Sequence, residues 1–198
     1  SSVYLHILEQ LIEHCLKPDN HSYTPSDFPL VSNLDQNKLD ELVETLPEMV
    51  DVYPLSPLQE GMLFHSLYQQ SEEVYIEQMR MTLTGELNIA HFEQAWNAVI
   101  QKHTILRTGF IAPQGLSPLQ FVINDAHSQV LMTNAESWSE AELDDFLSKD
   151  RQQGFDLANP PLMRFNLLQQ GSEQYIFVWT SHHILADGWS FPLIILEV

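Results

Sequence analysis

The spacing of apolar and polar residues divides the chain into helical and extended segments. Helical spacing or composition predicts helices at 3–16, 34–46, 56–69, 89–100 and 139–153, and a last helix after Gly188. Apolar runs rich in β-type residues predict strands at 75–84, 106–112, 119–123, 130–133, 162–169 and 174–180. This order of elements predicts an α/β fold built as an α+β layered sandwich.

Local sequence also predicts where some helices start and which faces they bury. Asp35 and Asn88 stand at expected N-cap positions, and Ser56–Pro57–Leu58–Gln59 has the residues of a capping box. The acidic run Glu140–Asp150 is expected to be a solvated helix face. One apolar cluster of the helix after the capping box is expected to lie in the core: Met62, Leu63, Phe64 and Leu67.

Composition narrows the possible functions. The 198 residues are 44% hydrophobic, which is enough apolar material for a packed core. The 27 acidic and 8 basic residues give a net charge of −19, which disfavours nucleic acid and anionic membrane surfaces as partners. Cys15 is the single cysteine, which rules out an internal disulfide and fits a cytoplasmic protein. No apolar run approaches the roughly 18 residues of a membrane-spanning helix.

The residues that best suit chemistry follow the apolar strand 175–180. The segment Ser181–Ser190 reads SHHILADGWS, so two histidines, an aspartate and a glycine come directly after a buried strand. Imidazole titrates near neutral pH and suits proton transfer, and an aspartate four residues later can fix the loop or the ring. Gly188 permits a tight turn or a backbone N–H aimed into the site.

Other interpretations of this segment remain open at the level of the local pattern. Adjacent histidines beside an Asp-Gly turn also occur without a catalytic role. A metal site has little support because the chain has no HExxH helix and no CxxC pair. A serine hydrolase lacks its G-x-S-x-G elbow.

Ordered motifs make the sequence more specific. The segment 181–190 resembles the HHxxxDG signature of condensation domains in nonribosomal peptide synthetases. Residues 53–65, YPLSPLQEGMLFH, resemble the first core motif of that family, and residues 102–110, KHTILRTGF, resemble its second motif, RHxxLRTxF. Residues 155–164 resemble a further recurring segment. These matches come in the family's order, and the chain is therefore identified as a member.

The resemblance implies a role for each residue of the signature. His183, the second histidine, would act on an acceptor amine that attacks a donor thioester, either as a base or by holding the amine and the tetrahedral intermediate. Asp187 would be structural, with Arg107 of the second motif as its partner, because a carboxylate near the site needs a bidentate cation. His182 would pack within the loop, and Gly188 would lie near the reaction centre. Trp189 and Ser190 would line a substrate tunnel, and no metal is implied.

The resemblance also implies an architecture and partners. Residues 1–34 resemble the tail of an upstream domain with its linker, and residues 35–198 resemble the N-terminal lobe of a two-lobed, chloramphenicol-acetyltransferase-like condensation domain. The second lobe would be absent, so the isolated fragment is expected to be inactive. Both substrates would arrive on phosphopantetheine arms of upstream and downstream peptidyl carrier domains. Adenylation domains and an epimerization domain would be neighbours, and the first motif resembles the subtype that takes a D-configured donor.

Lys102 departs from the family's second motif, which usually begins with arginine. Lysine keeps the charge and loses the planar fork, so a bidentate contact is not expected at this position. Three rival functions stay open: an epimerization domain, a CoA-dependent acyltransferase of the same superfamily, and a non-catalytic lobe that docks carrier domains.

Overall fold

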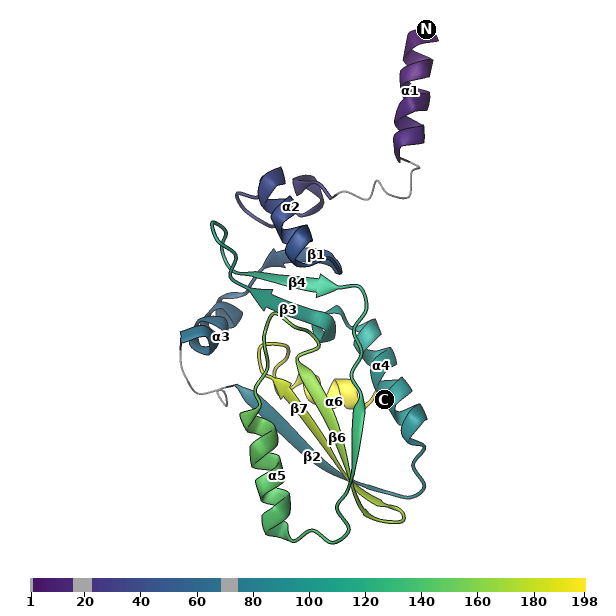
Figure 1. Cartoon of the computed structure of the whole chain (residues 1–198), viewed down its shortest axis with the longest axis vertical. Coiled ribbons are helices and arrows are strands. Elements are labelled where there is room, and N and C mark those ends of the chain that lie inside the picture. Colours follow the sequence, from purple (N-terminus) through teal and green to yellow (C-terminus); the bar gives the residue numbers. More distant parts are fainter. Residues whose placement is uncertain (1, 16–22, 69–74) are drawn as a thin grey trace.

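The computed structural model describes residues 2–15, 23–68 and 75–198, and it contains two β-sheets with helices packed against them (Figure 1). The smaller sheet has the antiparallel order β1 (Met49–Pro54), β4 (Leu119–Ile123) and β3 (Thr108–Ile111). The larger sheet has the order β2 (Ile76–Thr84), β7 (Gln174–His182), β6 (Met163–Gly171) and β5 (Val130–Asn134). Only β5 and β6 pair in parallel among these described strands.

Helices cover both faces of the larger sheet. Successive residues of β7 point to opposite faces, and large apolar side chains lie on each face. Phe177 and Trp179 pack against Trp96 of α4 (Ile89–Lys102), whose ring centroid lies 5.5 and 4.9 Å from theirs. Ile176 and Val178 pack instead in a cluster with Leu143 and Leu147 of α5 (Glu140–Gln152). The two helices lie on opposite sides of the sheet in Figure 1. This double burial explains why β7 reads as an unbroken apolar run.

The remaining helices complete the layers. Helix α2 (Gln36–Thr45) buries Leu39 and Leu42 against the smaller sheet, and α6 (Ser190–Ile195) buries Phe191 and Ile194 in the cluster that contains Trp179. Helix α3 (Pro57–Tyr68) follows β1 directly. Helix α1 (Ser2–Cys15) stands apart from the sheets in Figure 1, and its side chains from Val3 to Glu13 are all exposed. None of the helices in the described residues is long and apolar enough to cross a bilayer.

The predicted fold class and most predicted elements are confirmed. The expected N-caps Asp35 and Asn88 accept hydrogen bonds, and the Ser56–Gln59 capping box forms with contacts of 3.0 and 3.4 Å. Ser139 caps α5 in the same way, which was not predicted. The expected strand at 106–112 is shorter, because the 3-10 turn η2 (Thr104–Arg107) precedes β3. The expected tail-and-linker segment at 1–34 contains a short 3-10 turn, η1 (Pro25–Asp27). Its residues 18–22, and the predicted helix ends Leu16 and Gln69, lie outside the described residues.

Two sequence expectations are wrong. In α3, Met62 and Leu63 are buried, but Phe64 and Leu67 are 59% and 58% exposed because they lie on the outer face of the helix. In α5, Asp150 is buried beneath the sheet rather than solvated, because Arg164 of β6 pairs with it. Strand β1 was not predicted from the sequence, although it forms one edge of the smaller sheet.

Candidate active site

The SHHILADGWS segment lies at the end of β7, as the sequence predicted. Strand β7 ends at His182, and a loop leads from His183 to α6. Strand β2 runs antiparallel beside it, with Ile76 opposite His182 and Glu77 opposite Ser181. The start of β2 therefore lies beside His182 at the end of β7 and beside the loop that begins with His183.

The first histidine, His182, is buried, and each of its ring nitrogens contacts another group of the protein. Its Nδ1 accepts a hydrogen bond from the Ile184 backbone N–H at 3.1 Å, and its Nε2 lies 3.4 Å from the Ser66 hydroxyl. Burial, with a smaller contribution from the neighbouring His183, lowers the pKa of His182 from 6.5 to about 4. His182 is therefore neutral at physiological pH, and its two hydrogen bonds join the end of β7 to Ile184 and to α3.

The second histidine, His183, is placed differently. Its backbone N–H donates to the Tyr75 carbonyl at 2.8 Å, and its side chain keeps 31% of its surface exposed. Its Nδ1 lies 3.1 Å from Oε1 of Glu77 on β2. Its Nε2 makes no hydrogen bond with any residue in the described part of the chain. Of the two imidazoles, His183 is the one with a ring nitrogen available to a substrate.

Asp187 stabilises the turn that leads into α6 by accepting hydrogen bonds from Trp189 and Ser190. Its Oδ1 accepts hydrogen bonds from the Ser190 hydroxyl at 2.8 Å, the Ser190 N–H at 3.1 Å and the Trp189 N–H at 3.2 Å. The Ser190 hydroxyl is the main cause that lowers the pKa of this carboxyl below its usual value. Asp187 thus closes the loop on itself, which is a structural arrangement.

The expected ion pair between Arg107 and Asp187 does not form among the described residues. The Arg107 Nη1 donates instead to the Ile123 carbonyl at the end of β4, and its Nε is buried without a hydrogen-bond partner. Arg107 is the last residue of η2, directly before β3 of the smaller sheet, and this position of its backbone directs the side chain to β4 rather than to Asp187. Asp187 is exposed and already satisfied by backbone and hydroxyl donors, so it does not need the cation.

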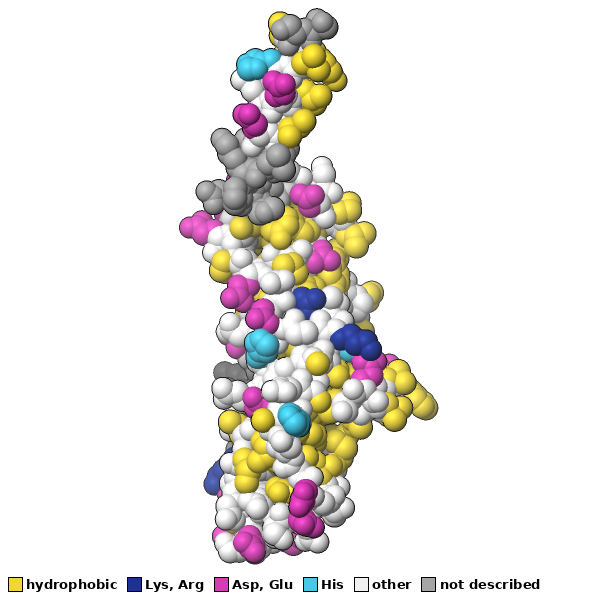
Figure 2. Space-filling view, turned by 90° about the vertical axis from the view of Figure 1, so that its right-hand side faces the viewer, with side chains coloured by type: hydrophobic (Ala, Val, Ile, Leu, Met, Phe, Trp, Pro, Cys, Tyr) yellow, Lys and Arg dark blue, Asp and Glu magenta, His cyan; other side chains and the backbone are white. Residues whose placement is uncertain are grey.

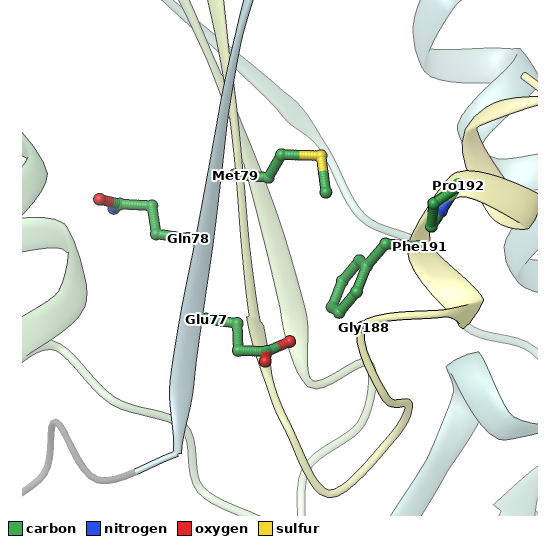
Figure 3. Close-up of a pocket in the computed structure, with 6 residues that line it drawn as sticks. All are labelled: Glu77, Gln78, Met79, Gly188, Phe191 and Pro192. Carbon is green, nitrogen blue, oxygen red and sulfur yellow. The ribbon is translucent and has the colours of Figure 1, made fainter.

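A pocket of about 400 Å³ opens beside the histidine loop (Figure 3). Six residues line it, from the start of β2, from the loop and from α6: Glu77, Gln78, Met79, Gly188, Phe191 and Pro192. Figure 3 shows the Glu77 side chain turned toward the loop and the Gln78 side chain on the opposite side of β2. Trp189 is 83% exposed, outside this lining. No group of three potential metal ligands occurs within residues 2–15, 23–68 and 75–198.

One face of the molecule is mixed in character. Figure 2 shows hydrophobic side chains, scattered carboxylates and a few cations on the face that it presents, without a continuous basic area. This distribution agrees with the acidic composition of the chain.

The other two motifs touch this loop or its flanks. Gln59 of the first motif donates through Nε2 to the Ile184 carbonyl at 3.3 Å, so a hydrogen bond joins α3 to the loop. In the second motif, Lys102 and His103 both bind Glu197, at 2.9 and 2.7 Å. The contact of Lys102 is a single point charge on one oxygen, as expected for lysine at a position where the family usually has arginine.

Sequence reasoning missed a polar cluster between α5 and the larger sheet. We call it the Asp150 cluster: Asp150, Arg164, Asn166, Thr180 and Gln78. Arg164 Nε donates to Asp150 at 2.8 Å, Gln78 Nε2 donates to it at 2.8 Å, and the Thr180 hydroxyl also binds it. Thr180 immediately precedes Ser181, so the cluster ties α5 to the strand end that carries the histidines. Glu77 was missed as well, because a glutamate in an alternating strand gives no signal of its own.

The sequence matches a known family profile over most of its length. The profile is described as the condensation domain, and it matches residues 49–198. The chain belongs to the condensation domain family. The matched range contains the three motifs at 53–65, 102–110 and 181–190, so the family membership expected from their order is confirmed.

Relatives of this condensation domain are large synthases. The chain is 42% identical over 201 residues to a component of linear gramicidin synthase from Brevibacillus parabrevis, in an alignment that covers 98% of this chain and 2% of that protein. It is 42% identical over 151 residues to a component of plipastatin synthase from Bacillus subtilis (strain 168), with 74% and 4% covered. The starter condensation domain of rhizomide synthetase RzmA superposes with a TM-score of 0.65 at 27% identity, covering 74% of this chain and 37% of that one. The chain thus spans a small part of these synthases and about a third of a solved condensation domain.

Proposed function

We propose that this condensation domain takes part in amide bond formation between two carrier-bound substrates, and that His183 acts on the amine. The amine nitrogen of the acceptor attacks the thioester carbonyl of the donor, a C–N bond forms and the C–S bond breaks. The proton lost by the amine passes to His183 and then to the departing thiolate. No covalent bond to the protein is needed, because the amine is itself the nucleophile.

The placement of the two histidines supports this role. His182 has both ring nitrogens engaged and is neutral, whereas His183 presents a free Nε2 at a partly exposed position beside the pocket that Gly188 lines. A general base must reach the proton that it removes and must be able to change its protonation state. Of the two adjacent imidazoles, His182 is buried and kept neutral, and only that of His183 has a ring nitrogen within reach of a substrate proton.

The partners in this proposal follow from the chemistry of a tethered reaction. The donor thioester and the acceptor amine would each be carried on a phosphopantetheine arm of a peptidyl carrier domain, with adenylation domains supplying the aminoacyl groups. An upstream epimerization domain and a D-configured donor belong to the same proposal, as does the division into a tail and linker at 1–34 and an N-terminal lobe at 35–198. We further propose that this lobe alone does not condense substrates, because an open pocket on one lobe cannot enclose two arms.

The test uses the complete condensation domain that contains this chain, with donor-loaded and acceptor-loaded carrier domains. We expect His183→Ala to lower the rate of amide formation by about 10²–10⁴-fold, which is the usual contribution of general base catalysis. His91→Ala, a substitution on the exposed side of α4, is the matched control and should leave the rate unchanged. Normal turnover by His183→Ala would overturn the assignment, and carrier binding without any turnover by the wild-type domain would favour a docking lobe.

A further inference from the structure

Glu77 is the carboxylate that faces the proposed base. It lies on β2 opposite Ser181, and its side chain points toward the loop that carries Gly188 (Figure 3). Its Oε1 lies 3.1 Å from Nδ1 of His183. The neighbouring Gln78 points to the other side of the strand, where it joins the Asp150 cluster.

Both side chains of this contact carry a buried atom without a hydrogen-bond partner in the part of the chain that the structure describes. Oε2 of Glu77 and Nδ1 of His183 are both buried, and neither makes a hydrogen bond within the described residues. Oε1 of Glu77 lies within 3.1 Å of Nδ1 of His183, yet no hydrogen bond forms between them. A buried donor or acceptor left unpaired costs free energy, so a small rotation that aligns the two groups is favourable. Catalytic hydrogen bonds are often loose in substrate-free structures and tighten when substrate binds.

The backbone around the contact is fixed on both sides. The His183 N–H is held by the Tyr75 carbonyl at 2.8 Å, two residues before Glu77 on the same chain segment. On the far side of β2, Gln78 Nε2 binds Asp150 at 2.8 Å and Thr180 Oγ1 at 3.2 Å. Strand β2 therefore cannot turn about its axis without breaking these bonds, and Glu77 is kept facing the ring.

We propose that Glu77 is a positioning residue that keeps the proton of neutral His183 on Nδ1. A carboxylate only accepts hydrogen bonds, so it favours the tautomer that carries its proton on the nearer nitrogen. Nε2 is then unprotonated and takes the proton from the acceptor amine, and the same proton later goes to the leaving thiolate. The negative charge of Glu77 stabilises the imidazolium that results, as the aspartate of a Ser-His-Asp triad does for its histidine. This inference rests on the proposed role of His183.

The experiment compares Glu77→Gln with Glu86→Gln in the complete condensation domain, assayed with loaded carrier domains. Each variant removes one negative charge, and Glu86 lies beyond the end of β2, away from the loop. Glutamine keeps the shape of Glu77, but its NH₂ can donate to Nδ1 and so permits the opposite tautomer. Glu77→Asp is a second variant that keeps the charge on a shorter side chain.

Two readouts separate positioning from folding or binding. The first is the rate at saturating carriers, which we expect to fall about 10–100-fold in Glu77→Gln, less in Glu77→Asp, and not at all in Glu86→Gln. The half-saturating concentration of the acceptor carrier should stay the same. The second is the ¹⁵N spectrum of the His183 ring, assigned by its loss in His183→Ala. It should show a protonated Nδ1 in the wild type and a growing share of protonated Nε2 in Glu77→Gln.

The outcomes are distinct from those that test His183. A wild-type rate and an unchanged ring tautomer in Glu77→Gln, with His183→Ala inactive, would overturn the role of Glu77 alone. A raised half-saturating concentration with an unchanged saturating rate would also overturn it, because Glu77 would then bind the acceptor rather than position the base. Normal turnover by His183→Ala would instead remove the proposed function on which the inference depends.

Discussion

Replacing Asp150 by alanine tests whether the Asp150 cluster, between α5 and the larger sheet, stabilises the domain. The Asp150 and Arg164 side chains keep only 4% and 18% of their surface exposed, and their Oδ1 and Nε atoms lie 2.8 Å apart. Removing one partner of a buried pair leaves an uncompensated charge and costs about 3–5 kcal/mol. Arg164 would retain the Gly154 carbonyl at 2.8 Å and its place over the Phe155 ring, so we expect the lower end, about 3 kcal/mol.

The same helix provides the control. Asp145 and Lys149 approach more closely, at 2.6 Å, but their side chains are 60% and 69% exposed. Exposed pairs contribute about 0–1 kcal/mol because water and salt screen them. Urea denaturation of the domain should therefore show a much lower midpoint for Asp150→Ala than for Asp145→Ala. Equal, small shifts in the two variants would refute the claim that burial, rather than distance, sets the strength of these pairs.

Substitutions at His182 and Gly109 probe the loop and the second motif, and Gly61→Ala is the control for the second. Because the pKa of His182 is lowered from 6.5 to about 4, the unfolded chain binds more protons between these values, and stability should fall by up to about 3 kcal/mol as the pH drops through this window. Urea denaturation of His182→Gln should show a smaller loss over the same pH range, and parallel losses would contradict the assignment. A Cβ added at Gly109 would lie 2.6 Å from Cε1 of Phe121, so thermal or urea unfolding of Gly109→Ala should show about 1–3 kcal/mol of destabilisation. Gly61→Ala, where a Cβ meets no atom within 4 Å inside α3, should be neutral or stabilising by up to about 1 kcal/mol, and similar losses at both sites would be contrary to this packing.

Elements with a local signal could be predicted from the sequence. The capped helices begin where Asp35, Asn88 and the Ser56–Gln59 capping box place them, because a cap depends on residues only three positions apart. The apolar run of β7 and the loop after it were also correctly placed, since burial on both faces leaves a strong pattern. Strand β1 escaped prediction because its pairing partner β4 lies far along the chain, and its own sequence contains Asp51 and Pro54.

Pairings between distant residues could not be predicted. The scarcity of cations suggested that Arg107 meets Asp187, but the position of η2 beside the smaller sheet directs Arg107 to a backbone carbonyl instead. Asp150 looked like one more charge on an acidic helix, because its partner Arg164 comes from a strand that the helix pattern does not reveal. Glu77 became visible only when the register of β2 and β7 placed it beside His183.

The central claim is that His183, and not His182, acts on the acceptor amine. A single-turnover assay of the complete condensation domain, with a donor-loaded and an acceptor-loaded carrier domain, tests it most directly by measuring amide product over time. We expect His183→Ala to form product about 10²–10⁴-fold more slowly than the wild type while its circular dichroism spectrum is unchanged. Product formation by a folded His183→Ala domain at the wild-type rate would contradict the account.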